Sequence, residues 1–285
     1  MFQNIEGKIC LSYYILKDFD MYNDLIGFRL KFDNVLPEEL KEMIINYLKL
    51  FNRFEIKVTH NLLSSGKIDN LIKICEQYAK TKYSIHLPKN MLKRVADYED
   101  AIGLISVLNK YWVSNVNVIT HIPVTNYNEY ISKIIKFSQL LDNKNVFLLE
   151  NKVIFYNNFE YLKQINDLFN CLNKMGIRHI GMCLDIAHLL FGAYKESLSQ
   201  KEIFDILKQY PILLKSVKQI HLHDYNTLSD HLLLGEGMID IDELKKFINE
   251  NIDNVPVIIE TTINNPKSDG IHQIHIAKSI INKVV

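Results

Sequence analysis

The chain has 285 residues, of which 48% are hydrophobic and 23% charged, a composition typical of globular proteins rather than disordered or fibrous ones. Its 33 basic and 33 acidic residues cancel, so the chain as a whole offers no cationic field for a nucleic-acid backbone. The amino-terminal segment lacks the pattern of a secretory signal, and no window approaches about 18 continuous apolar residues. We therefore expect a cytoplasmic protein that has no membrane partner.

Eight short apolar runs, rich in Val and Ile, follow one another along the chain. They lie at 27–32, 54–60, 83–88, 116–123, 145–151, 179–188, 218–224 and 255–261. Nearly continuous hydrophobic runs of this length are typical of strands that are buried on both faces. Apolar residues at three- and four-residue spacing predict amphipathic helices at 37–51, 67–80, 129–141, 159–175 and 241–252.

This alternation of strand and helix predicts a parallel sheet. The number of units favours a (β/α)8 TIM barrel that occupies residues 26–285 as a single domain, with a doubly wound open sheet as the alternative. Residues 1–25 are interpreted as an N-terminal extension, although the segment KICLSYYI within them could itself be the first strand.

Residues that can bind a metal or move a proton end most of these runs. They are His60, His86, His121, Glu150, Asp185, His221, His223 and Glu260, with His188 shortly after Asp185. In a (β/α)8 barrel the carboxyl ends of the strands converge on one face. Carboxylates that converge there would repel one another unless a cation or protons compensated their charge. We therefore expect a divalent metal, and mixed imidazole and carboxylate ligands suit zinc, manganese or cobalt.

Two parts of this region leave alternatives open. His221 and His223 share one face of their strand by two-residue alternation, so either could be the metal ligand, with the other supporting it or contacting substrate. The segment SDHLLLGEGMID adds His231 and Glu236. These two residues could contact substrate, or the segment could simply be a turn into a helix that Asp240 caps.

The motifs SIHLP, THIP, LLEN, GMCLDIAHLLFGAY, HLHD, DHLLLGEG and VIIET occur in this order between residues 83 and 262. This order resembles the xylose isomerase-like barrel superfamily, which contains endonuclease IV and the sugar isomerases and epimerases. The resemblance implies a divalent metal at the carboxyl-terminal mouth of a (β/α)8 barrel. The metal ligands of the isomerase and epimerase branch correspond to Glu150, Asp185, His221 and Glu260. The two glutamates of that branch also form its acid/base pair, and His188 corresponds to a histidine that contacts substrate.

Endonuclease IV, which uses three zinc ions, resembles the chain too. The ligands of its two additional sites correspond to His86, His121 and Glu150, and to His188 and His231. The second of these sites also uses an aspartate two residues before its last histidine. Here Ser229 stands at that position, and Asp230 adjoins His231 instead. The segment between His221 and His231 is also short for a DNA-contacting insertion, so nucleic acid is not an expected partner.

Together these features predict a metal-dependent isomerase or epimerase acting on a small polyhydroxylated carbonyl compound, such as a sugar, a sugar phosphate or an inositol ketone. One glutamate would remove a proton next to the carbonyl, and the metal would stabilise the resulting enediolate. Thr227 stands near the position of the arginine that grips substrate in the best-known epimerases, which argues against ketose 3-epimerase activity.

The remaining residues of the predicted site are expected to contact substrate or to bind a second metal. They are His86, His121, His188, His223, His231 and Glu236. The alternatives to an isomerase are a zinc-dependent phosphodiesterase of the endonuclease IV type and a barrel retained only as a binding module. Assembly into a homo-oligomer is compatible with the sequence.

Overall fold

The structure is a computed structural model, and it describes residues 26–31, 53–60, 69, 73, 82–89, 91–93, 95–110, 116–123, 127–141, 145–261 and 271–281. The predicted extension at 1–25 and the predicted helix at 37–51 lie outside the described residues. Of the predicted helix at 67–80, Asp69 and Lys73 are described, and both are helical. The chain divides into two compact units, residues 1–148 and 149–285.

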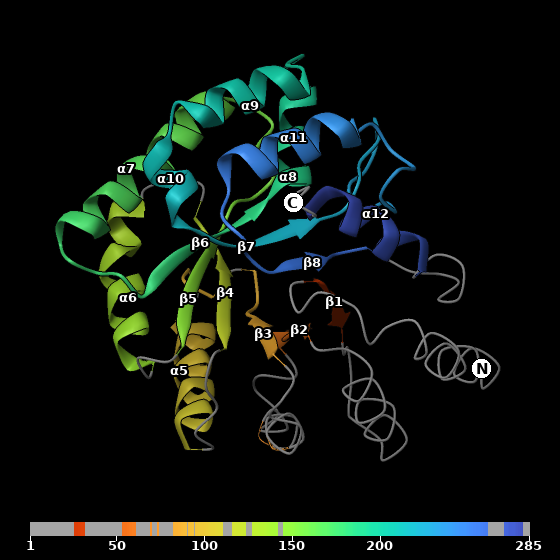
Figure 1. Ribbon diagram of the computed structural model, residues 1–285. Helices are drawn as coiled ribbons and strands as arrows, with labels where there is room; N and C mark the ends of the chain where they lie inside the picture. The colour runs from red at the N-terminus through yellow and green to blue at the C-terminus, as the bar shows by residue number, and fades with distance from the viewer. Residues whose placement is uncertain are drawn as a thin grey trace. The chain divides into compact units, whose positions relative to one another are not determined.

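The first unit contains parallel strands that pair in sequence order (Figure 1). These strands are β1 (Ile26–Lys31), β2 (Arg53–Lys57), β3 (Lys82–His86) and β4 (Asn117–His121), and the helices are α5 (Val95–Lys110) and α6 (Tyr127–Leu140). Strand β5 (Val146–Glu150) begins here, and the Val146 N–H donates to the Val116 carbonyl (3.1 Å). Phe137 of α6 packs on Phe147 of β5 with ring centroids 4.8 Å apart, which anchors the helix to the sheet.

The second unit has the same alternation of strand and helix (Figure 1). Its strands are β6 (Ile180–Asp185), β7 (Val217–Leu222) and β8 (Val257–Ile259), and its helices are α7 (Asn158–Lys174), α8 (Ile186–Lys195), α9 (Gln200–Lys208), α10 (Pro211–Ser216), α11 (Ile241–Asn251) and α12 (Ile271–Ile281). All three strands are parallel, with Asp185 opposite His221 and Leu222 opposite Ile259. Every residue of β6 is buried, as its continuous apolar sequence predicts.

Local sequence explains where several of these helices begin. Asp240 caps α11 by accepting the Glu243 N–H (3.0 Å), as predicted. Ser199 caps α9 in the same way, and the Glu202 side chain in turn accepts the Ser199 N–H (2.7 Å).

All eight predicted strands are present, and they follow one another in sequence order from β1 to β8, the order of a (β/α)8 barrel. The predicted fold class is therefore confirmed. The prediction of one strand over 179–188 was wrong at its end, because β6 stops at Asp185 and α8 begins at Ile186. The Asp185 side chain causes this change by accepting the His188 N–H (2.9 Å) as a helix cap. Among the described helices, none is both long and apolar enough to cross a membrane.

Candidate metal centre and histidine cluster

Four buried side chains at the ends of β5 to β8 form a group that we call the first cluster. Its members are Glu150, Asp185, His221 and Glu260. Each offers one potential ligand atom, and these four atoms all lie within 4.8 Å of one another. His221 Nδ1 lies 3.0 Å from Glu150 Oε1 and 3.3 Å from Glu260 Oε2. The structure thus brings together the four residues that the resemblance assigned as metal ligands.

Strand register places this cluster. Asp185 and His221 are opposite one another across the parallel pair β6 and β7, so both side chains reach the same edge of the sheet. Glu260 follows β8, and its N–H donates to the carbonyl of Leu222 at the end of β7 (2.9 Å). Buried Gln219, two residues before His221, lies with Nε2 3.1 Å from His221 Nε2. Because an amide can present nitrogen or oxygen, Gln219 can accommodate either tautomer of His221.

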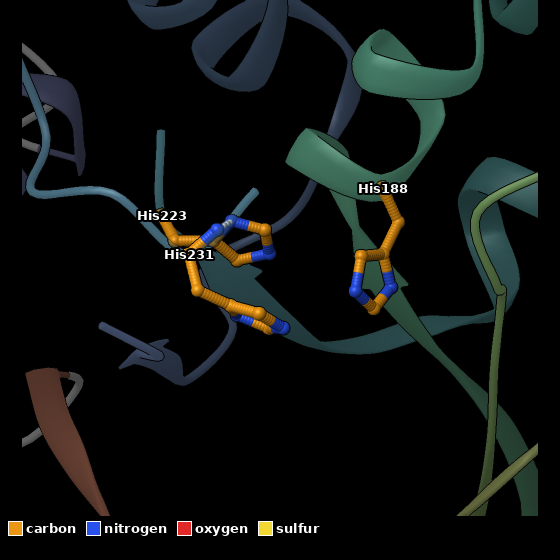
Figure 2. A group of neighbouring side chains, drawn as sticks. All are labelled: His188, His223 and His231. Carbon is orange, nitrogen blue, oxygen red and sulfur yellow. Dashed lines mark hydrogen bonds between the residues drawn. The ribbon is translucent and has the colours of Figure 1, made fainter. Parts of the chain in front are cut away.

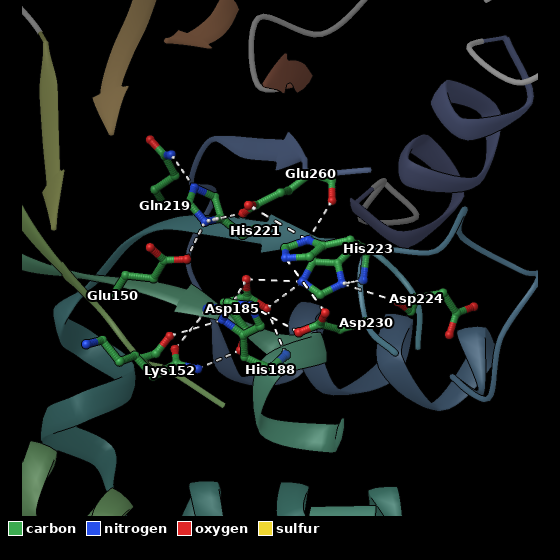
Figure 3. Close-up of polar contacts among 12 residues, drawn as sticks. Glu150, Lys152, Asp185, His188, Gln219, His221, His223, Asp224, Asp230 and Glu260 are labelled. Atoms are coloured by element: carbon green, nitrogen blue, oxygen red, sulfur yellow. Dashed lines mark hydrogen bonds and ion pairs between the residues drawn. The ribbon is translucent and has the colours of Figure 1, made fainter. Parts of the chain in front are cut away.

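Asp185 occupies the centre of the polar network (Figure 3). The Asn151 side chain holds its backbone, accepting the Asp185 N–H (2.9 Å) and donating to its carbonyl (2.7 Å). Its carboxylate lies 3.2 Å from His188 Nδ1 and 3.1 Å from His223 Nε2. Burial by itself would raise the pKa of Asp185, but the neighbouring His188 and His223 imidazoles outweigh it and hold that pKa below its usual range. Asp185 is therefore an ionised potential ligand.

His188, His223 and His231 form a second group, the histidine cluster (Figure 2). Ring centroids are 5.2 Å apart for His188 and His223, 5.5 Å for His188 and His231, and 4.2 Å for His223 and His231. Burial foremost, and then the neighbouring His223, lower the pKa of His231 to about 3. Burial also lowers the pKa of His188. Neutral imidazoles of this kind are the form that binds metals.

Asp224, which is not among the predicted site residues, organises the segment that carries His231. Its buried carboxylate accepts the backbone N–H groups of Tyr225 (2.8 Å), Gly235 (3.0 Å), Gly237 (3.0 Å) and Ile239 (3.1 Å). A Cβ at Gly237 would lie 2.2 Å from Asp224 Oδ1, so only glycine fits there. The sequence carries a signal for this role. HLHD supplies the acceptor, and the glycines of the following GEG let the backbone approach it closely.

The other predicted site residues are placed as follows. His86 and His121 end β3 and β4, and both are buried with ring centroids 4.9 Å apart. Their predicted pairing with Glu150 stays a prediction. Glu236 is exposed in the turn between Gly235 and Gly237, and its role in binding substrate also stays a prediction.

Parallel βα units in barrel order, with carboxylates and imidazoles gathered at strand ends, define a (β/α)8 barrel with a candidate metal centre. Within that class, the chain belongs to the xylose isomerase-like TIM barrel family, whose pattern matches residues 85–278. The family resemblance read from the sequence motifs is therefore confirmed.

One curated relative is "Probable endonuclease 4" of Mycoplasma mobile, 30% identical over 104 residues, which are 34% of this chain and 37% of that protein. The crystal structure of AsfvAP:AG is similar with a TM-score of 0.60 and 14% identity, covering 90% of this chain and 99% of that one. An L-ribulose 3-epimerase structure has a TM-score of 0.56 and 13% identity, covering 90% of this chain and 91% of that one.

A further structure is that of a xylose isomerase-like TIM barrel protein from Mycobacterium smegmatis in complex with magnesium. It has a TM-score of 0.55 and 12% identity, covering 87% of this chain and 90% of that one. At these identities the likeness to solved structures is one of fold, so the reaction has to be argued from the residues of the two clusters.

Proposed function

We propose that this protein is a divalent-metal-dependent isomerase or epimerase that acts on a small polyhydroxylated carbonyl compound. The observation that carries the proposal is the placement of Glu150 and Glu260, whose carboxylates lie 3.0 Å and 3.3 Å from the same nitrogen, His221 Nδ1. Both carboxylates therefore converge on the same point of the site, and together they can serve as the two proton carriers that such a reaction needs.

The donor set of the first cluster fits a divalent metal. Three buried carboxylates and one imidazole place their ligand atoms within 4.8 Å of one another. A cation would compensate the negative charge of these carboxylates. Oxygen and imidazole nitrogen together suit manganese, zinc or cobalt. When bound, the metal would act as a Lewis acid that polarises the substrate carbonyl.

The chain's own residues would then move the proton. One glutamate accepts a proton from the carbon next to the carbonyl, and the C–H electron pair forms the enediolate. In an epimerase the other glutamate returns a proton to the opposite face of the same carbon. In an isomerase it returns the proton to the former carbonyl carbon, while the hydroxyl proton of the first carbon passes to the former carbonyl oxygen, so that the first carbon becomes the new carbonyl. Asp185 is held in the site, because the Asn151 side chain hydrogen-bonds to its backbone N–H and carbonyl.

The test is an exchange experiment in deuterated water. The protein and Mn²⁺ are incubated with ketoses, inositol ketones and their phosphates, and the mass of each compound is followed. We expect deuterium next to the carbonyl of at least one compound, with a rate that falls about 100-fold or more in Glu150→Gln and Glu260→Gln, the scale of a lost general base. Exchange that is undiminished in both variants would overturn the assignment of the glutamates.

A zinc-dependent phosphodiesterase is the second candidate, and the histidine cluster together with the Mycoplasma mobile relative favours it. Clustered zinc ions could activate water and bind a scissile phosphate. Because the net charge is zero, we expect no incision of an abasic-site duplex at physiological salt. Metal-dependent incision at catalytic protein concentrations, abolished in Glu150→Gln, would put this candidate first.

A further inference from the structure

We propose that His223 is a positioning residue, which links the segment that carries His231 to the Asp185 carboxylate and does not itself bind a metal. His223 belongs to the histidine cluster, but hydrogen bonds occupy both of its ring nitrogens. One nitrogen binds the backbone of the segment, and the other binds Asp185. The inference rests on the proposed function, since that function makes Asp185 a metal ligand.

The segment that carries His231 folds back beside the residues that follow β7. Asp224 and Leu232 exchange two backbone hydrogen bonds there, each of 2.9 Å. His231 has a φ of 62°, in the left-handed region that a non-glycine residue seldom adopts. Its carbonyl accepts the Thr261 hydroxyl (3.0 Å), and its N–H donates to His223 Nδ1 (2.9 Å). A strained backbone is kept where the surrounding structure requires it, and His223 supplies one of the contacts that hold this one.

The contact with His231 determines where the proton of the His223 ring lies. A backbone N–H only donates, so Nδ1 accepts with its lone pair, and the proton of the neutral ring lies on Nε2. Nδ1 also lies 3.2 Å from the Asp224 carbonyl. A proton on Nδ1 would point at the His231 N–H, however, and the Asp224 carbonyl already accepts the Leu232 N–H.

Asp185 requires the same tautomer from the other side of the ring (Figure 3). His223 Nε2 lies 3.1 Å from Asp185 Oδ1 and 3.2 Å from Oδ2. A carboxylate only accepts, so a lone pair on Nε2 would be repelled, whereas an N–H there donates. Two separate contacts thus select one tautomer, and with both of them made the ring has no lone pair left for a metal.

This arrangement lets the segment act on the first cluster. Carboxylates that bind metals are in turn hydrogen-bonded by other side chains, which orient them. Asp185 accepts the His188 N–H (2.9 Å) and the His223 Nε2–H, so His223 helps to determine how the carboxylate is turned. Since Asp224 arranges the same segment, a change in its position would reach Asp185 through His223.

Two amide variants separate the two contacts of His223. An asparagine side chain can place its oxygen where Nδ1 lies and accept the His231 N–H, but it is too short to reach Asp185. A glutamine side chain can place its nitrogen where Nε2 lies and donate to Asp185, while the contact with His231 is lost. We therefore expect His223→Asn to bind Mn²⁺ about 10–100-fold more weakly than wild type, and His223→Gln to bind it with nearly the wild-type affinity.

Isothermal titration calorimetry of the full chain with Mn²⁺ measures these affinities. His275→Asn, at an exposed histidine of α12, is the control and should bind Mn²⁺ as wild type does. Wild-type affinity in His223→Asn would overturn the proposal. So would a His223→Gln variant that loses as much affinity as His223→Asn, because a residue that binds the metal itself would be lost in both.

The tautomer is tested without any metal. Nitrogen-15 NMR of the metal-free protein with labelled histidines, at neutral pH, shows which ring nitrogen carries the proton, and the His223 signals are those missing from His223→Gln. We expect the proton on Nε2, and a proton on Nδ1 would overturn the proposal. Wild-type protein that binds no Mn²⁺ would instead contradict the proposed function, so the two failures are distinguishable.

Discussion

Asp224 shows how one buried side chain can arrange a whole functional segment. Its two oxygens accept four backbone N–H groups between Tyr225 and Ile239, and His231 lies within that stretch. Hydrogen bonds to a charged acceptor are worth about 1.5–3 kcal/mol each, and buried donors left without an acceptor are costly. The position of His231 therefore depends on Asp224 as well as on its own backbone conformation.

Asp224→Asn should lower the free energy of unfolding by about 2–4 kcal/mol, since an amide cannot accept at both positions. Urea denaturation measures this loss. Gly237→Ala should act in the same direction, because its Cβ would lie 2.2 Å from Asp224 Oδ1. The control is Gly103→Ala in α5, where a Cβ would meet nothing within 4 Å. Equal stability of Gly237→Ala and Gly103→Ala would contradict this account of the segment.

At the level of single residues, the sequence indicated the candidate ligands more readily than the residues that support them. Glu150, Asp185, His221 and Glu260 each end an apolar run, and the family resemblance assigns these four as metal ligands. The supporting roles of Asn151 and Gln219 could not be predicted, because they depend on groups brought close only by the fold. Which of His221 and His223 binds a metal stays a prediction, and the two histidines have different neighbours. His221 lies between the glutamates, and His223 contacts Asp185.

Among the elements, the boundary between β6 and α8 shows where hydrophobic pattern alone fails. Residues 186–190 are apolar apart from His188, and α8 is buried over most of its length. A helix that is buried all round has no polar face, so its sequence reads like a continuation of the strand. The deciding feature is Asp185, which acts as helix cap and as a member of the first cluster.

Helix α9 provides a test of the capping interactions in this unit. Ser199→Ala removes the side chain that accepts the Glu202 N–H (3.3 Å) and leaves half of the capping box. We expect a loss of about 1 kcal/mol in the free energy of unfolding, measured by urea denaturation. Lys201→Ala in the same helix is the control, since it leaves the cap intact. A Ser199→Ala variant as stable as Lys201→Ala would show that the cap contributes nothing.

For the molecule as a whole, the fold could be predicted because the repeating βα pattern extends along the chain. The strand order and the family match over residues 85–278 confirm it. The reaction could not be predicted to the same degree, since one fold hosts isomerases, epimerases and nucleases. Self-association stays a prediction.

Metal removal should destabilise the whole protein. A ligand that binds the folded form and not the unfolded form raises stability, so a chelator should lower the Tm, and added Mn²⁺ or Zn²⁺ should restore it. Differential scanning calorimetry of protein with and without a chelator measures the shift. In Asp185→Ala the chelator should have a much smaller effect. A shift in that variant equal to that of wild type would mean that the stabilising metal binds elsewhere.

We expect Glu150, Asp185, His221 and Glu260 to share one metal ion. The most direct test of this expectation is the anomalous difference density of a crystal loaded with Zn²⁺ or Mn²⁺. A shared ion should give a peak about 2.0–2.2 Å from a ligand atom of each of the four residues. Density at this position that contacts none of the three carboxylates, or no peak there at saturating metal, would show that these residues do not share an ion.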